Sequence, residues 1–287
     1  MQRIVDTHIH VWDLSRADYP WLKGDATILN RSYKLDEIDE ERKVAGVTHG
    51  VMVQASCNLD DTNMMLEVAE QNDWIRGVVC WLPLADTSRA AKLLDHCFLP
   101  HEYFKGVRHL IHDEQDPRWL LQHSVIESLK LLAENDIPYD VVGVLPAHIE
   151  TVLEVATQVP DLRMIFDHLN APPISTRERF GKWGSLMKEA ANNKNIFAKI
   201  SGLGTASGNF SGRTVEDIKP YVAFALEHFG TERCLCGGDW PVSALVNTYA
   251  DTWMITKNIV SELVNETEQE AIYYRNADKF YDLGLDH

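Results

Sequence analysis

The chain has 287 residues, of which 45% are hydrophobic, and its 43 acidic against 27 basic side chains give a formal net charge of −16. This length can bury a large core and fits one large domain or two small ones. The negative charge argues against nucleic acid, because phosphate backbones are bound by basic surfaces. A neutral or cationic small substrate fits this charge better, although a local arginine can still hold an anion.

The first predicted element is a strand, Ile4 to His8, which leads into a second histidine, His10. Because side chains alternate along a strand, Asp6, His8 and His10 are expected to share one face. Imidazole nitrogens bind zinc-like ions at about 2.0–2.1 Å, so two converging histidines suit a metal or a substrate carbonyl. The alternative is that both histidines are polar residues that only cap the strand.

Strand-like apolar runs then alternate along the chain with helical patterns, whose apolar residues recur three and four positions apart. Eight strands in fewer than 300 residues predict an α/β fold, a single-domain (β/α)8 barrel over residues 1–287. An open doubly wound sheet is disfavoured, because His8-Ile9-His10 replaces its glycine-rich phosphate loop. The predicted strands span residues 4–8, 49–54, 75–82, 105–110, 137–143, 164–168, 196–202 and 234–239.

After the last strand, two more helices are predicted, at about residues 243–264 and 267–282, and Thr267-x-x-Glu270 is a capping-box pattern for the second. Five cysteines, scattered on apolar stretches, indicate buried thiols in a reducing compartment rather than a disulfide framework. The chain begins in a strand without a leader pattern, and no apolar run approaches about 18 residues. We therefore expect a cytoplasmic protein without a membrane partner.

Barrel enzymes build their sites at the carboxyl ends of the strands, and polar side chains gather at the predicted ends. Charged groups in an apolar barrel are costly unless they are paired or functional. Each residue alone has a structural alternative, such as a salt bridge for Arg108 or Lys199. The side chains at these ends are His8, His10, Gln54, Arg108, His109, His168, Lys199, Ser201 and Asp239.

The last of these strand ends reads Gly237-Gly238-Asp239-Trp240-Pro241, which is also what a structural turn looks like. Together with His8-Ile9-His10, it resembles the amidohydrolase superfamily, and within it the branch of sugar-lactone and pyrone-dicarboxylate lactonases. The resemblance covers nearly the whole chain, through residues 5–13, 105–109, 160–168, 199–203 and 238–241.

The resemblance implies a working site of four residues: His8, His10, His168 and Asp239. Asp239 can act as general base for water that attacks an ester carbonyl, and the histidines, Arg108 or a bound cation can stabilise the oxyanion. Flat aromatic rings suit a sugar face, although most of the tryptophans are expected in the core. The predicted substrate-binding residues are Gln54, Arg108, His109, Lys199, Trp12, Trp81 and Tyr139, with Trp21 and Trp240 as further aromatic candidates.

Binuclear members of the superfamily use a modified lysine on the fourth strand and a histidine on the fifth. Arg108 and His109 occupy the fourth strand here, and Tyr139 and Asp140 the fifth, so a binuclear centre is not expected. One zinc-like ion on His8, His10 and Asp239, and catalysis without metal, are the two alternatives.

Similar proteins read Asp-His-x-Gly-Lys-Pro after the sixth strand, where this chain reads Asp167-His168-Leu169-Asn170-Ala171-Pro172. Asn170 can adopt the left-handed conformation that glycine would supply. The missing lysine removes whatever that side chain contributes to the loop in the similar proteins.

The resemblance implies a hydrolase that opens the lactone of a sugar acid, and the choice of L-fucono- or L-rhamnonolactone rests on the resemblance alone. A metal-dependent decarboxylase of the same superfamily is the second hypothesis, and the absence of a histidine on the fifth strand counts against it. A barrel that binds a sugar acid without catalysis is the third, disfavoured by the intact set of His8, His10 and Asp239.

Overall fold

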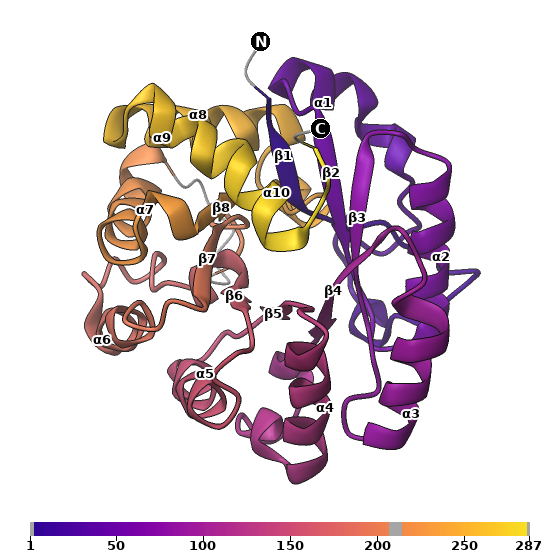
Figure 1. Ribbon diagram of the computed structural model, residues 1–287. Helices are drawn as coiled ribbons and strands as arrows, with labels where there is room; N and C mark the ends of the chain where they lie inside the picture. The colour runs from indigo at the N-terminus through magenta and orange to yellow at the C-terminus, as the bar shows by residue number, and fades with distance from the viewer. Residues whose placement is uncertain (1–2, 207–213, 286–287) are drawn as a thin grey trace.

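The computed structural model describes residues 3–206 and 214–285, which form one sheet of eight parallel strands in the order β1 to β8 (Figure 1). The predicted (β/α)8 barrel is confirmed. The strands are β1 Val5–Ile9, β2 His49–Val53, β3 Ile75–Cys80, β4 Phe104–His109, β5 Tyr139–Val141, β6 Met164–Phe166, β7 Ile196–Ile200 and β8 Cys234–Cys236.

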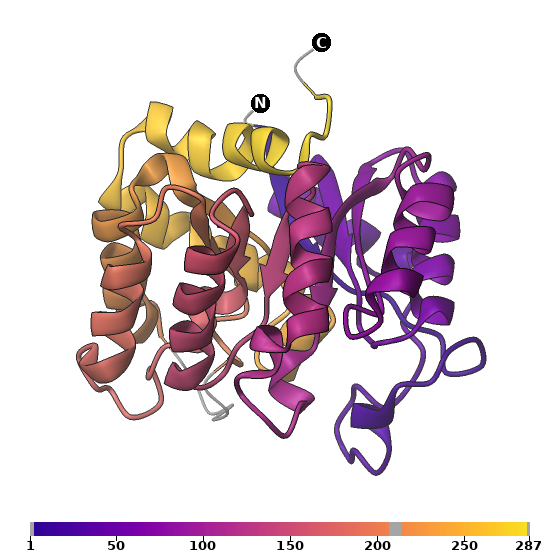
Figure 2. The ribbon, with the colours of Figure 1, turned by 60° about the horizontal axis from the view of Figure 1, so that its bottom comes forward.

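Helices surround the strands, and Figure 2 shows both termini at one end of the barrel and the long loop after β1 at the other. Several helices begin at a residue whose side chain accepts a hydrogen bond from the first turn, such as Asn58 for α2 and Thr248 for α8. The helices are α1 Asp39–Ala45, α2 Leu59–Glu70, α3 Thr87–Leu93, α4 His123–Glu134, α5 Pro146–Gln158, α6 Gly181–Ala190, α7 Val215–Phe229, α8 Tyr249–Leu263, α9 Glu266–Glu270 and α10 Asn276–Tyr281.

All eight predicted strands exist, but several end earlier than the apolar pattern predicts. β6 stops at Phe166, and the next residues form a short 3-10 turn, Asp167–Asn170. His168, Leu169 and Asn170 have φ values of 53°, 50° and 51°, so the left-handed conformation predicted for Asn170 is confirmed. The chain therefore leaves the sheet where it has to turn polar side chains into the barrel mouth.

A β-bulge in β1 changes which side chains face inward. Asp6 pairs with Gly50 and Ile9 with Met52, so β1 has one residue more than β2 over this stretch. The prediction that Asp6 shares a face with His8 is wrong, because the extra residue shifts the alternation. Asp6 contacts the outer helix α8, whereas His8 contacts side chains inside the barrel.

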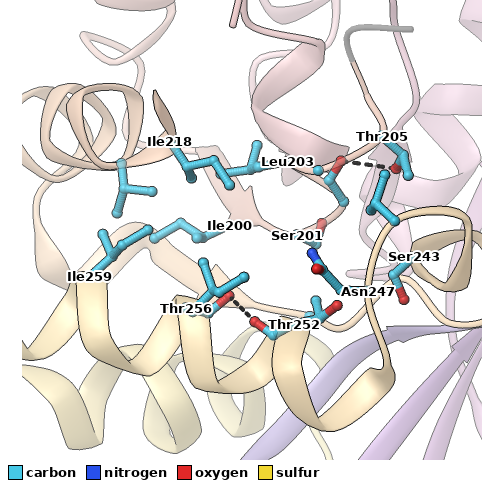
Figure 3. A pocket seen from close by; sticks show the side chains of 16 residues that line it. Ile200, Ser201, Leu203, Thr205, Ile218, Ser243, Asn247, Thr252, Thr256 and Ile259 are labelled. Atoms are coloured by element: carbon cyan, nitrogen blue, oxygen red, sulfur yellow. Dashed lines mark hydrogen bonds between the residues drawn. The ribbon is translucent and has the colours of Figure 1, made fainter. Parts of the chain in front are cut away.

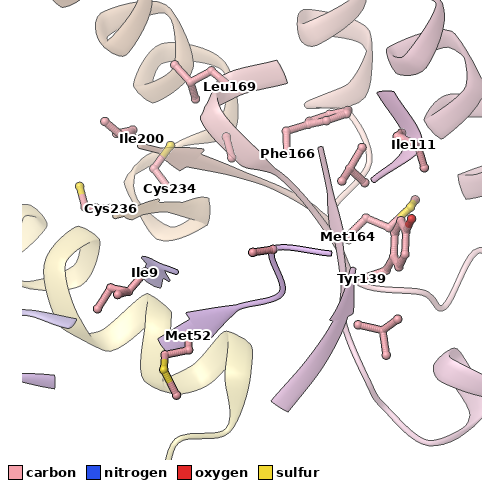
Figure 4. Close-up of a cluster of buried hydrophobic side chains, with 14 of the residues drawn as sticks. Ile9, Met52, Ile111, Tyr139, Met164, Phe166, Leu169, Ile200, Cys234 and Cys236 are labelled. Carbon is pink, nitrogen blue, oxygen red and sulfur yellow. The ribbon is translucent and has the colours of Figure 1, made fainter. Parts of the chain in front are cut away.

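Most of the apolar core lies between the strands and the surrounding helices; Figure 4 shows Met52, Phe166 and Cys234 in this layer. A second cluster fills the amino-terminal end of the barrel, where Phe280 and Tyr281 of α10 pack against Val5, Ile165 and other strand residues. In Figure 2 this C-terminal segment lies at the end that carries both termini. The end of the barrel opposite the predicted site is therefore closed by the chain itself.

Two details of the sequence prediction are corrected. Helix α9 begins after Asn265, which exchanges hydrogen bonds with Glu268, so Thr267-x-x-Glu270 is not the capping box. All five cysteines are free, as expected, but Cys97 is exposed rather than buried, because it lies on the outward side of the turn that follows α3. Among the described residues, no helix has both the length and the apolar composition needed to cross a bilayer.

The Asp6 carboxylate joins β1 to the end of β8 and to α8. It accepts hydrogen bonds from Gly238 N at 2.9 Å, Tyr249 Oη at 2.7 Å and Trp253 Nε1 at 3.2 Å. Asp6 also accepts a hydrogen bond from His8 N at 2.9 Å and is fully buried, so its loss would leave four donors without this acceptor.

We expect Asp6→Ala to lower the free energy of unfolding by about 3–5 kcal/mol, the range typical of a broken buried network. Urea denaturation measures this as a lower midpoint with an unchanged slope. The matched control is Asp18→Ala, which removes an exposed carboxylate that pairs with Lys23 and should change stability by about 0.5 kcal/mol or less. Equal effects of the two variants would contradict this role of Asp6.

Candidate active site

The candidate site lies on the seam where β1 meets the end of β8. Asp239 N donates to His8 O at 2.8 Å and His10 N donates to Trp240 O at 2.7 Å, so the backbone itself fixes the two motifs side by side. Asp239 has a φ of 57°, and its carboxylate turns back over the mouth of the barrel. The closure of the barrel thus brings together residues that lie at opposite ends of the sequence.

The predicted working residues converge around one carboxylate oxygen. Asp239 Oδ1 lies 3.8 Å from His8 Nε2, 3.6 Å from His10 Nε2 and 3.8 Å from His168 Nε2. The two Nε2 atoms of His8 and His10 are 3.1 Å apart. The structure therefore brings together all four residues that the sequence predicts for the working site.

His168 reaches this position from the left-handed turn after β6, and Ser201 Oγ holds its Nδ1 at 2.9 Å. Gly202 makes this approach possible: a Cβ there would lie 2.5 Å from His168 Nδ1 and 2.6 Å from Asp239 Oδ2, and its φ is 57°. Only glycine fits such a position without displacing both side chains. Burial lowers the pKa of His168, although Asp239 opposes the shift.

Four charged side chains lie just beneath this cluster, inside the barrel. Lys199 Nζ contacts Asp140 Oδ2 at 2.7 Å and Asp167 Oδ1 at 2.8 Å, and Arg108 Nη1 contacts Asp167 Oδ2 at 2.9 Å. Both Lys199 and Asp167 are fully buried, and two acids balance two bases. Such pairing is what allows charged groups to remain inside a protein.

Burial and the neighbouring charges determine the protonation states of Asp167, Lys199 and His8. Burial raises the pKa of Asp167, but Lys199, His8 and Arg108 outweigh it and hold that pKa well below its usual range. Burial would lower the pKa of Lys199, but Asp140 and Asp167 raise it instead. Asp167 is therefore a carboxylate and Lys199 an ammonium at neutral pH. Burial keeps the pKa of His8 well below its usual range, so this imidazole is neutral.

A cavity of about 270 Å³ opens above the working residues. Of the predicted substrate-binding residues, Arg108 and Trp12 line it; Trp21 does so as well. The lining is largely apolar, and its polar side chains include the working residues His10, His168 and Asp239. The lining residues are His10, Trp12, Trp21, Ala55, Arg108, Leu110, His112, Val142, Val144, His168, Thr205, Ala206, Asp239, Val242 and Leu245.

The other predicted substrate-binding residues lie outside this lining. His109 is held between Glu114, 2.7 Å from its Nε2, and Trp81, whose indole donates to its Nδ1 at 3.1 Å, and it stacks on Trp119. The side-chain amide of Gln54 donates to Arg108 O. Tyr139 and Lys199 are fully buried beneath the cavity.

Two further residues that line the cavity, His112 and Thr205, are not among the predicted site residues. His112 lies three residues beyond the end of β4, where its Nδ1 is 3.3 Å from Val142 O, and burial lowers its pKa. Its position in the loop after a barrel strand is the signal that could have found it, because such loops build the mouth. Thr205 follows the turn at Gly202, and its hydroxyl lies 3.5 Å from Asp239 Oδ2.

A smaller cavity of about 30 Å³ lies behind this turn, between β7, α7 and α8 (Figure 3). Isoleucines 200, 218 and 259 form one side of it, and Ser201, Ser243 and Asn247 lie toward the other. It has room for only one or two water molecules, so it is too small for a sugar. The larger cavity is therefore the candidate substrate site.

The geometry of His8, His10 and Asp239 fits a single divalent cation. One ligand atom from each lies within 4.8 Å of the others. His10 Nδ1 lies 2.7 Å from Val53 O, so it donates there and leaves the Nε2 lone pair facing Asp239. Ligands at zinc distances in a tetrahedron lie about 3.3 Å from one another, close to the 3.1–3.8 Å separations here.

We expect the chelator-treated protein to bind one zinc ion per chain, measured by isothermal titration calorimetry. His10→Ala removes one of three ligands and should weaken this binding at least about tenfold. The matched control is His112→Ala, which removes a histidine of the same cavity outside the ligand set. Equal affinity in the wild type and in His10→Ala would place the zinc elsewhere.

Comparison with known proteins adds three relatives. The chain is 27% identical to an L-fucono-1,5-lactonase of Burkholderia ambifaria, over 96% of this chain and 94% of that one. It is 27% identical to an L-rhamnono-gamma-lactonase of Scheffersomyces stipitis, over 62% of this chain and 59% of that one. An amidohydrolase of Burkholderia multivorans, solved with bound zinc, superposes with a TM-score of 0.89 at 25% identity. The superposition covers 97% of this chain and 99% of that one. The amidohydrolase family profile matches residues 5–283, so the chain belongs to the amidohydrolase family.

Proposed function

We propose that this protein is a lactonase, which hydrolyses the cyclic ester of a sugar acid to the open carboxylate. The observation that carries the proposal is the Asp239 carboxylate, held among three imidazoles at the floor of a cavity of about 270 Å³. A carboxylate in this position can accept a proton from water while neighbouring groups stabilise the negative charge that forms on the carbonyl oxygen. The lactonase names of two relatives support the same reaction class.

Each working residue has a chemical role in this proposal. Asp239 is the general base, and the Arg108 guanidinium, whose Nη1 lies 3.3 Å from His8 Nε2, supplies positive charge at the floor. His168 is neutral because burial lowers its pKa, so it serves as a hydrogen-bond donor or acceptor rather than as a cation. A divalent ion on His8, His10 and Asp239 would polarise the lactone carbonyl and lower the pKa of the attacking water.

The cavity wall favours a neutral lactone with an apolar side. Val142, Val144, Val242 and Leu245 provide aliphatic surface, and the Trp12 and Trp21 rings add aromatic surface. A six-carbon deoxy sugar lactone, such as L-fucono- or L-rhamnonolactone, can place its methyl group and ring face there. Among the described lining residues, Arg108 is the one permanently cationic side chain, which does not suit a dicarboxylate.

The reaction is tested by acid release, followed with a pH indicator, over a panel of sugar 1,4- and 1,5-lactones and one pyrone dicarboxylate. We expect hydrolysis of deoxy sugar lactones, and at least about tenfold lower kcat/KM for the dicarboxylate, because its second carboxylate would be buried without a cation. Preference for the dicarboxylate would contradict the substrate class. Acid release from no lactone would remove the lactonase proposal, and carbon dioxide release from carboxylic acids would then test a decarboxylase.

The role of Asp239 is tested with Asp239→Asn, which keeps the size of the side chain but removes the base. We expect kcat to fall by about 10²–10⁴-fold, the contribution typical of a general base. The control is Asp113→Asn, in the loop after β4 but outside the cavity lining, which should leave kcat unchanged. A wild type that binds the lactone without turnover would instead identify a sugar-acid-binding protein.

A further inference from the structure

The sequence predicts Lys199 as a substrate-binding residue, yet its side chain is fully buried below the cavity. Its ammonium contacts three groups, each from a different strand or strand end: Asp140 Oδ2 at 2.7 Å, Asp167 Oδ1 at 2.8 Å and His8 Nδ1 at 3.3 Å. We propose that Lys199 is a positioning residue, which holds the His8 imidazole in the orientation that the proposed lactonase reaction needs. This inference rests on the proposed function.

The two nitrogens of His8 face different surroundings. Nε2 points to the reacting end of the site, toward His10 and Asp239. Nδ1 points into the barrel, where Lys199 Nζ and Asp167 Oδ1 both lie at 3.3 Å. An imidazole nitrogen either donates or accepts, so a protonated Nδ1 donates to Asp167 Oδ1, which Lys199 Nζ holds at 2.8 Å, and an unprotonated Nδ1 accepts from Lys199 itself. In both tautomers the partner of Nδ1 restricts rotation of the ring about its side-chain bonds. Contacts at Nδ1 therefore set where Nε2 points.

Lys199 is itself anchored from the closed end of the barrel. Its main partner, Asp140 on β5, accepts hydrogen bonds from Tyr281 Oη at 2.8 and 3.0 Å. Tyr281 is the last residue of α10 and belongs to the apolar cluster that fills this end. A chain of contacts thus runs from α10 through Asp140 and Lys199 to His8.

A simpler role for Lys199 would be to balance the charge of Asp140. The two roles predict different behaviour when both charges are removed. If Lys199 only balances charge, the double variant Lys199→Met/Asp140→Asn restores what Lys199→Met loses, because one acid and one base are removed and Asp167 stays paired with Arg108. If Lys199 holds His8, the double variant stays impaired, because the ammonium that contacts both His8 Nδ1 and the Asp167 carboxylate beside it is still missing.

We expect kcat for the preferred lactone to fall at least about tenfold in both Lys199→Met and the double variant, because misplacement of a catalytic group by a fraction of an ångström is costly. KM should stay within about threefold, because Lys199 does not line the cavity. Lys257→Met is the control: this half-buried lysine donates to Ala45 O on the outer helices, and its loss should leave kcat unchanged. Wild-type kcat in the double variant would overturn the proposal.

A second measurement does not depend on turnover. In protein with 15N-labelled histidine, the ring-nitrogen resonances of His8, assigned by their loss in His8→Asn, should move in the double variant, while those of His228 on α7 should not. The single variant Asp140→Asn keeps Lys199 and its ion pair with Asp167, so it should shift the His8 resonances less than the double variant does. Unchanged His8 resonances in both would overturn the proposal. Failure of the wild type to hydrolyse lactones would overturn the proposed function alone.

Discussion

The closure of the barrel between β1 and β8 is the constraint on which the rest of the structure depends. Two backbone hydrogen bonds, from Asp239 N to His8 O and from His10 N to Trp240 O, join segments that lie about 230 positions apart in the chain. The same bonds hold the two histidines against the Asp239 carboxylate. The buried Asp6 carboxylate reinforces this seam from outside through Gly238 and α8. Stability of the fold and geometry of the site therefore depend on the same few contacts.

The interior of the barrel is organised in three layers along its axis. The closed end is apolar and includes side chains of α10. Above it lie Asp140, Lys199, Asp167 and Arg108, whose charges balance, so their burial is offset by direct pairing. The imidazoles and Asp239 form the third layer, at the mouth. Each layer packs on the one below, so the reacting groups rest on a floor of paired ions that have little freedom to move.

The barrel provides the reactive groups, whereas loops form most of the cavity above them. Trp21 comes from the loop after β1, His112 from the loop after β4 and Val144 from the loop after β5. The loops supply mostly apolar lining residues, whereas the strand ends supply His10, Arg108 and Asp239, a combination that suits a ring with polar and apolar parts. Reaction type and substrate choice are thus divided between two parts of the fold, as is usual for barrels of this class.

The sequence by itself determined the eight strands and the barrel, because hydrophobic periodicity identifies strands and a parallel barrel brings the polar side chains at their carboxyl ends together. The family resemblance then selected His8, His10, His168 and Asp239 from those side chains. The sequence did not determine the outward turn of Asp6, since the bulge in β1 adds a residue that periodicity cannot reveal. Nor did it separate Lys199, which is held by buried acids, and His109, which is held by Glu114 and Trp81, from the residues that face the cavity. Those distinctions depend on distances between side chains of different strands and loops, and such distances exist only once the chain has folded.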